Sequence, residues 1–208
     1  NFLTTSPDAL GFLSKNRLNY FIPNPSDQSM ETLNNFKKDC SNDVFFALSH
    51  GVHRGQLKTR SSDDREKFIK SLIDKCKNIR FDIFGMDNIQ PIWADQYFKN
   101  ISNSKMGLNL SRGEPIKYYS SDRITQIIGN GLVTLIDEKT FYRDFFSDKE
   151  MVFYSNLNNL AEKIQKISKD EKLRKKIGKN GKEKYMKYFN STKVADFIIN
   201  RVFETKKK

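Results

Sequence analysis

The chain has 208 residues, with 37 Lys plus Arg against 25 Asp plus Glu, so its formal net charge is +12 at pH 7. Its 17 Phe and 8 Tyr argue against intrinsic disorder, because disordered chains are poor in aromatic residues. The sequence has no apolar run of the roughly 20 residues that a membrane-spanning helix needs, and its start lacks the basic and apolar segments of a signal peptide.

Two features bear on cellular setting and on completeness. Cys40 and Cys76 form neither a disulfide framework nor a metal-type pair, so a reducing cytosol is the default expectation. The chain begins at Asn1 and its first residues already read as the middle of a fold, so we expect a fragment or a processed chain.

The first 42 residues predict two short strands and a linker. Phe2–Thr5 and Tyr20–Ile22 are β-prone runs, and Ser6-Pro7 marks the start of a helix between them. The polar segment 28–42 predicts a linker helix, with three apolar residues at helical spacing: Met30, Leu33 and Phe36.

Strands then alternate with helices. Val44–Leu48 is a continuous apolar run, which is typical of a strand buried on both faces. Further strands are predicted at Phe81–Phe84, Met106–Leu110, Leu132–Ile136 and Met151–Tyr154. Helices are predicted from Asp63 or Asp64, over Trp93–Ile101, around Ile124–Ile128 with an end at Gly129-Asn130-Gly131, and through the rest of the chain.

This alternation predicts right-handed crossovers and therefore an α/β fold. The expected architecture is a Rossmann-like parallel sheet with helices on both faces and a C-terminal helical extension. Ligands of such sheets bind at the carboxyl ends of the strands, so the loops after Leu48, Phe84 and Leu110 are the candidates.

The loop after Leu48 combines flexible glycines with two cations four residues apart. Gly51 and Gly55 let the backbone approach a phosphate closely, and Arg54 can hydrogen-bond it through two donors. Lys58 adds a second positive charge. The pattern suits a diphosphate leaving group, whose charge must be neutralised, although an ordinary surface turn has a similar composition.

The loop after Leu110 runs into a helix. Ser120 and Ser121 are placed to cap that helix and to donate to phosphate oxygens. Asp122 either accepts hydrogen bonds from ribose or sugar hydroxyls or only complements the helix dipole. Tyr118 and Tyr119 either stack on a ligand ring or belong to the core.

The positive charge gathers at the C-terminal end. Residues 162–208 hold 16 Lys plus Arg against 6 Asp plus Glu, a net charge of +10. Such a tail suits nucleic acid or an anionic membrane surface, or it consists of solvated helix faces. Nucleic acid is not favoured, because Tyr185, Tyr188 and Phe189 fit a buried helix face better than a stacking surface.

Taken in order, these pieces resemble the C-terminal domain of GT-B glycosyltransferases. Among these, the chain is similar to the bacterial glycosyl transferases family 1 that includes CgeB-like proteins, over roughly residues 4–203. The resemblance is carried by five segments: Phe21–Pro25, Gly51–Lys58, Arg123–Gly131, Phe153-Tyr154 and Val194–Phe203.

The resemblance implies four parts of the chain. Residues 1–27 would be the tail end of the N-terminal acceptor domain, and residues 28–42 the linker. Residues 43–190 would be the nucleotide-sugar-binding domain, followed by a C-terminal crossing helix and basic tail over residues 191–208.

The resemblance also implies roles for single residues. The donor diphosphate would be held by Gly51, Arg54, Gly55, Lys58, Ser120 and Ser121, and the donor ribose or sugar by Tyr119, Asp122, Arg123 and Gln126. Gln126 stands where many GT-B enzymes carry a ribose-binding glutamate, and Tyr118 stands where many retaining enzymes carry an acid. Both departures put the donor contacts and a retaining outcome in doubt.

The expected function is transfer of a sugar, of the hexosyl type, from a nucleotide-diphosphate-sugar to an unknown acceptor. We expect no cofactor and no metal, and a catalytic base on the missing domain. The expected location is cytoplasmic, with peripheral contact to the inner face of the membrane through the basic C-terminal helices. The alternative is a non-catalytic nucleotide-sugar or nucleic-acid binding module, and a structural domain of a larger assembly is also compatible.

Overall fold

The computed structural model describes residues 2–4, 19–48, 64–119 and 121–203. Some expectations fall outside these residues. They are the helix expected after Ser6, the loop with Gly51, Arg54, Gly55 and Lys58, and the side chain of Ser120.

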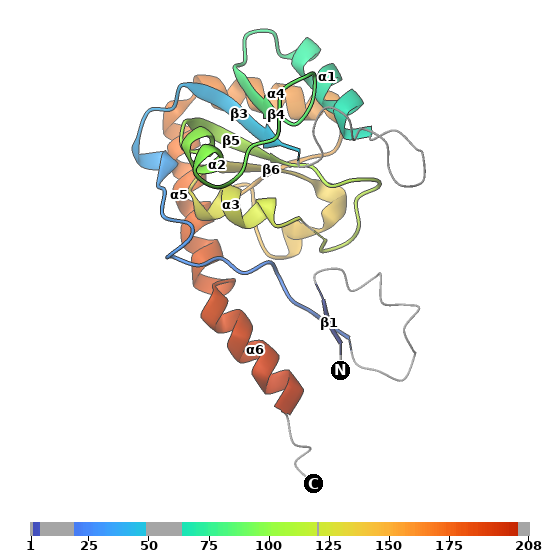
Figure 1. The fold of residues 1–208 in the computed structure, drawn as a ribbon, viewed down its shortest axis with the longest axis vertical. Coiled ribbons are helices and arrows are strands. Elements are labelled where there is room, and N and C mark those ends of the chain that lie inside the picture. The colour runs from blue at the N-terminus through green and yellow to red at the C-terminus, as the bar shows by residue number, and fades with distance from the viewer. Residues whose placement is uncertain (1, 5–18, 49–63, 120, 204–208) are drawn as a thin grey trace.

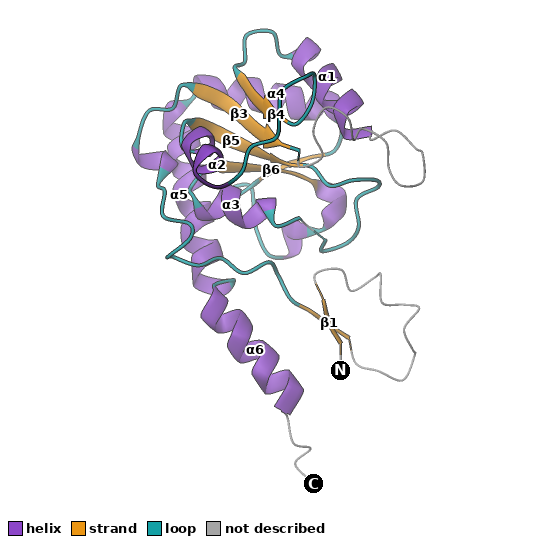
Figure 2. Ribbon diagram, in the orientation of Figure 1, coloured by secondary structure: helices purple, strands orange, loops and turns teal. Residues whose placement is uncertain are grey.

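The body of the protein is a five-stranded parallel sheet with the strand order β4-β3-β5-β6-β7 (Figure 2). The strands are β3 (Asn42–Ala47), β4 (Phe81–Phe84), β5 (Ser104–Asn109), β6 (Val133–Asp137) and β7 (Val152–Tyr154). The continuous apolar run in β3 is buried on both faces: Val44, Phe45 and Phe46 are each at most 1% exposed. The predicted α/β fold with a Rossmann-like parallel sheet is therefore confirmed.

Helices cover both faces of this sheet. They are α1 (Asp64–Lys75), α2 (Ala94–Ile101), α3 (Arg123–Gly129), α4 (Leu157–Lys169) and α5 (Glu171–Tyr188). Val44 and Phe46 of β3 pack in one cluster with α1 and α4, whereas Phe45 packs in another with Ile101 of α2 and Ile127 of α3. This division follows from the alternation of side chains along a strand.

The strand order creates a crevice at the carboxyl edge of the sheet. The chain passes from β3 outward to β4 and then returns to the opposite side of β3 as β5. In open parallel sheets, the point where the order reverses leaves the carboxyl ends of two strands uncovered, and ligands bind there. In this fold those ends are the residues after Ala47 and Asn109.

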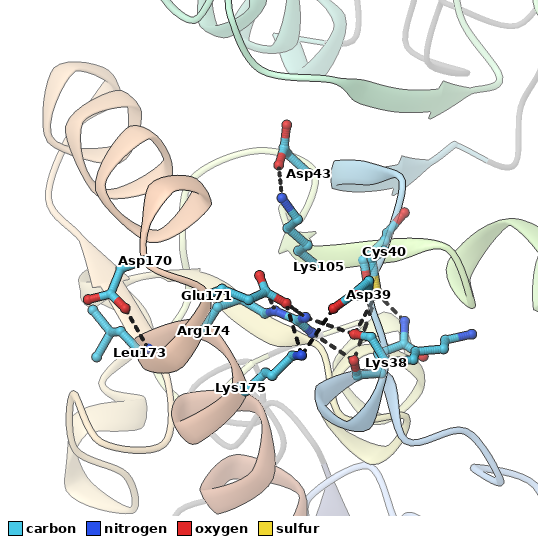
Figure 3. A network of polar contacts seen from close by, with 12 residues as sticks. Lys38, Asp39, Cys40, Asp43, Lys105, Asp170, Glu171, Leu173, Arg174 and Lys175 are labelled. Carbon is cyan, nitrogen blue, oxygen red and sulfur yellow. Dashed lines mark hydrogen bonds and ion pairs between the residues drawn. The ribbon is translucent and has the colours of Figure 1, made fainter.

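The predicted linker helix over residues 28–42 is wrong. The segment forms only one short 3-10 helix, Asn35–Lys37, because tertiary contacts take its backbone and polar groups. The Asn35 amide donates to the carbonyls of Ile101 and Ser104, at 2.8 Å each. The fully buried Arg174 of α5 donates to the Asn35 carbonyl at 2.7 Å and to the Lys38 carbonyl at 2.9 Å (Figure 3).

The two ends of the chain lie apart from the main sheet (Figure 1). β1 (Phe2–Thr4) and β2 (Asn19–Phe21) form a separate two-stranded parallel sheet, with β2 one residue earlier than predicted. α6 (Ser191–Phe203) runs away from the body and exposes Ile199, Val202 and Phe203. Within the described residues, no helix has both the length and the apolar composition needed to cross a membrane.

Candidate functional site

A cavity of about 290 Å³ opens at the carboxyl end of β3, and we call it the α2–α3 cavity. Its lining includes Leu48, Trp93, Tyr97, Asp122, Arg123 and Gln126. It therefore lies at the point where the strand order reverses, between the helix that leads into β5 and the helix that follows it. Position and size both suit a ligand of the fold.

Tyr97 offers this cavity an unused hydrogen-bonding group. Its hydroxyl oxygen is buried and has no hydrogen-bond partner among the described residues. Its ring packs edge-on against Phe45 with the centroids 5.1 Å apart, which fixes the side chain. Burial raises the pKa of the Tyr97 phenol, so it remains a neutral donor at physiological pH. An unsatisfied buried hydroxyl costs about 1–3 kcal/mol, a cost that a ligand acceptor would remove.

Trp93 supplies an aromatic surface in the lining. The indole is 63% exposed, although large apolar side chains are usually covered. It immediately precedes α2, whose first residue Ala94 has a left-handed φ of 46°. Strained backbone of this kind costs about 1–3 kcal/mol and clusters at ligand sites. An exposed ring there is suited to stacking on a planar ligand.

Gln126 projects from α3 into the lining of the same cavity. Its backbone carbonyl accepts from the Asn130 amide at 2.8 Å, which closes the helix end. The side-chain amide can both donate to and accept from hydroxyl groups. Sequence reasoning expected Gln126 at a ribose, and the structure places it at a cavity where such a contact can form.

The predicted capping of α3 by serine and aspartate side chains is wrong for the residues described. Asp122 occupies the N-cap position, but its side chain accepts no capping hydrogen bond. The Ser121 and Asp122 carbonyls instead accept from the Ile124 and Thr125 amides, at 3.1 Å each. A tight backbone turn therefore starts the helix. The Asp122 carboxylate is exposed and lines the α2–α3 cavity.

Arg123 and Ser121 form a hydrogen-bonded ridge beside the cavity. The Arg123 guanidinium donates to the Leu110 carbonyl at 3.0 Å and to Ser121 Oγ at 2.6 Å. Ser121 Oγ in turn donates to Asn109 Oδ1 at 3.3 Å. Burial, and then the nearby positive charge of Arg65, lowers the pKa of Arg123. Arg123 thus ties α3 to the end of β5 while it also lines the cavity.

A second cavity, of about 170 Å³, lies between the start of α1 and the carboxyl ends of β5, β6 and β7, and we call it the α1 cavity. Its lining includes Arg65, Asn109, Tyr119, Asp137 and Tyr154. The structure therefore separates two residues that sequence reasoning had grouped at one ribose or sugar. Tyr119 lines the α1 cavity, whereas Gln126 lines the α2–α3 cavity.

Tyr118 has a packing role, which resolves one of the alternatives that the sequence left open. Its ring lies 5.3 Å from the ring of Phe21 and 5.0 Å from that of Phe145, measured between centroids. Its hydroxyl donates to Asp144, and its backbone has a left-handed φ of 59°. Tyr118 therefore anchors the loop after β5, and its neighbour Tyr119 is the residue that reaches a cavity.

Sequence reasoning missed Arg65, Tyr97, Asp137 and Tyr154. The available signal was their position, because Tyr154 ends a predicted strand and Asp137 follows one, at the edge where ligands bind. Tyr97 lay within a predicted helix and gave no such signal. Among the residues that the structure describes, no cluster of three His, Cys, Asp or Glu side chains is arranged to hold a metal ion. Whether the protein needs a metal stays a prediction.

Comparison with known proteins gives one family and a set of similar folds. Residues 60–200 match the family model described as glycosyl transferase-like. No curated protein matches the sequence. Among solved structures, *S. aureus* TarM in complex with fondaparinux, α-GlcNAc-glycerol and UDP is similar, with a TM-score of 0.65 and 12% identity over 96% of this chain and 42% of that one.

Two further structures share the fold. Sucrose-phosphate synthase from Thermosynechococcus elongatus has a TM-score of 0.55 and 16% identity, over 97% of this chain and 58% of its own. The C-terminal domain of the glycosyl transferase group 1 family protein LpcC from Francisella tularensis has a TM-score of 0.51 and 13% identity, over 82% of this chain and 96% of its own. The chain thus spans about two fifths of TarM but nearly all of an isolated C-terminal domain.

Proposed function

The chain belongs to the glycosyl transferase-like family and has the fold of a GT-B C-terminal domain, and from that premise we propose that it binds the nucleotide-sugar donor of a sugar transfer. The nucleoside would occupy the α2–α3 cavity. The observation that carries this proposal is the buried, unpartnered hydroxyl of Tyr97 at the reversal point of the sheet. A nucleobase or ribose oxygen is the acceptor that this hydroxyl lacks.

Each end of a nucleoside finds a matching group in this cavity. The exposed Trp93 ring supplies a surface on which a base can stack, an interaction worth about 1–3 kcal/mol. Gln126 supplies an amide that can bind ribose hydroxyls, although it lacks the charge of a glutamate. The nucleoside contact is therefore compatible with the departure at Gln126.

The diphosphate would lie beside the ridge of Ser121 and Arg123. The two side chains bring a hydroxyl and a buried positive charge next to the cavity. The expected partners Gly51, Arg54, Gly55, Lys58 and Ser120 lie outside the described residues, so their roles stay predictions. The domain limits given above, the acceptor, the hexosyl type of the transfer and contact with an anionic membrane also stay predictions.

A thermal-shift screen of the chain with UDP, GDP, ADP, CDP and dTDP tests this function. One of these probes should stabilise the protein by about 2.7 kcal/mol at 100 times its dissociation constant. Tyr97→Phe should weaken that binding roughly three- to tenfold, because it removes one hydrogen bond. Tyr154→Phe makes the same chemical change in the α1 cavity and should leave the affinity for the nucleoside diphosphate unchanged. No shift with any probe would refute the proposal.

The alternative of a nucleic-acid binding module has little support in the described surface. Tyr185 is fully buried and Phe189 packs against it, as predicted, although Tyr188 is 51% exposed, contrary to prediction. A single exposed ring offers no row of stacking aromatics. Titration of a random oligonucleotide at increasing salt separates the two functions, since binding through phosphates weakens steeply with salt.

A further inference from the structure

The α1 cavity holds a second tyrosine hydroxyl without a partner. Tyr154 is 1% exposed and lines the cavity, and its hydroxyl oxygen has no hydrogen-bond partner among the described residues. Its ring lies 6.4 Å from the Phe68 ring of α1 between centroids. A neutral phenol held in this way is a hydrogen-bond donor that awaits an oxygen atom.

Asp137 stands beside Tyr154 as an acceptor. The two residues are paired in the register of β6 and β7, so their side chains lie on the same face of the sheet. Asp137 Oδ1 accepts from the Lys139 amide at 2.8 Å, and Asp137 is among the residues that line the cavity. A fixed donor next to a fixed carboxylate is an arrangement that recognises hydroxyl groups.

The charges around the cavity exclude one class of ligand. Its lining carries the three carboxylates Asp64, Glu114 and Asp137 against the single guanidinium of Arg65. An anionic group would meet a net negative surface, and like charges disfavour binding. A diphosphate or a uronate carboxylate therefore fits this cavity poorly, whereas an uncharged polyol fits it well.

The remaining walls suit a ring. Phe68, Leu110 and Ile116 contribute apolar surface, and a cavity of about 170 Å³ has room for one small cyclic molecule. A pyranose presents C–H groups on its faces and hydroxyls at its rim. Apolar walls with a few placed polar groups are typical of sites for small molecules.

A hydrogen-bonded ridge separates the two cavities. Arg123 lines the α2–α3 cavity, Asn109 lines the α1 cavity, and Ser121 Oγ is hydrogen-bonded to both. A molecule with a nucleoside at one end and a sugar at the other can lie across this ridge. The geometry thus relates the second cavity to the proposed donor site.

We propose that the α1 cavity binds the sugar ring of the donor and selects uncharged, hydroxyl-rich sugars, with Tyr154 and Asp137 as the residues that determine this specificity. This proposal rests on the proposed function, because it assigns the other end of the same donor. Tyr154 donates to one ring hydroxyl and Asp137 accepts from another, while the surrounding carboxylates reject sugars that carry a negative charge.

The test compares three ligands by calorimetry: the nucleoside diphosphate that binds in the screen, its glucose conjugate and its glucuronate conjugate. The wild-type chain should prefer the glucose conjugate to the glucuronate conjugate. Tyr154→Phe should weaken the glucose conjugate about three- to tenfold and leave the bare diphosphate within about twofold. Asp137→Asn should reduce the preference for glucose over glucuronate, because it removes one negative charge.

The outcomes separate the two proposals. If no nucleoside diphosphate binds, the proposed function fails and this inference fails with it. If the diphosphate binds but neither variant changes the affinity for the glucose conjugate, only this inference is overturned. Binding of free methyl glucoside that depends on Tyr154 would assign the cavity to an acceptor sugar and would also overturn it. The melting temperature of unliganded Tyr154→Phe should equal or exceed that of the wild type, since the hydroxyl has no partner to lose.

Discussion

Single tyrosine hydroxyls distinguish the cavities from the rest of the fold. Tyr185 is fully buried, and its hydroxyl donates to the Asn24 carbonyl at 2.7 Å, as buried polar groups generally do. Tyr97 and Tyr154 are the exceptions among the described tyrosines, and each lines a cavity at the carboxyl edge of the sheet. Unsatisfied groups at such places indicate ligand contacts better than composition does.

A residue-scale prediction concerns Arg174, the buried cation that holds the linker. Arg174→Ala should destabilise the chain by about 2–4 kcal/mol, because the Asn35 and Lys38 carbonyls lose their donor and a void remains. Arg174→Met should recover part of the packing and none of the hydrogen bonds. Urea denaturation measures both, with the exposed Lys172→Ala on the same helix as the control. Equal stability of Arg174→Ala and the control would contradict this account of the linker.

At the scale of elements, glycines allow α5 to lie directly against the turn before β6. A Cβ atom on Gly178 would stand 2.5 Å from the Gly131 carbonyl oxygen and 3.5 Å from Phe36 Cβ. Gly131 itself has a φ of 78°, which closes the turn after α3. The helix, the turn and the linker therefore meet in one place, and the backbone there has no room to yield.

Gly178→Ala tests this close approach. In an exposed helix the change would stabilise by about 1 kcal/mol, but here we expect a net loss of about 1–3 kcal/mol, because the added methyl group meets backbone. Thermal and urea denaturation report the difference, with the exposed Lys179→Ala next to it as the control. A gain in stability would show that α5 can shift away from the turn without cost.

The sequence predicted most elements but not the linker or the grouping of the site. Phe81–Phe84 was predicted with its observed bounds, because a short apolar run ends at Gly85, whose φ of 85° stops the strand. The helix expected around Met30 failed, since its polar groups bind partners more than 60 residues away, such as the carbonyl of Ile101. Tyr119 was predicted to share a site with Gln126, and only the tertiary fold shows that they line different cavities.

At the scale of the whole molecule, two cavities share one edge of the sheet and differ in chemistry. The α2–α3 cavity pairs an exposed indole with an amide and a hydroxyl, and the α1 cavity pairs a hydroxyl with carboxylates. β1, β2 and α6 lie away from this edge (Figure 1). The donor site that we propose is thus built by the five-stranded sheet and its covering helices.

The most direct test of the donor site is a crystal structure of the chain with the nucleoside diphosphate that gives the largest thermal shift. We predict a base stacked on Trp93, a hydrogen bond from Tyr97 to the nucleoside, and ribose hydroxyls within hydrogen-bond distance of Gln126. A nucleotide bound in the α1 cavity, or at any surface away from the carboxyl edge of the sheet, would contradict the account.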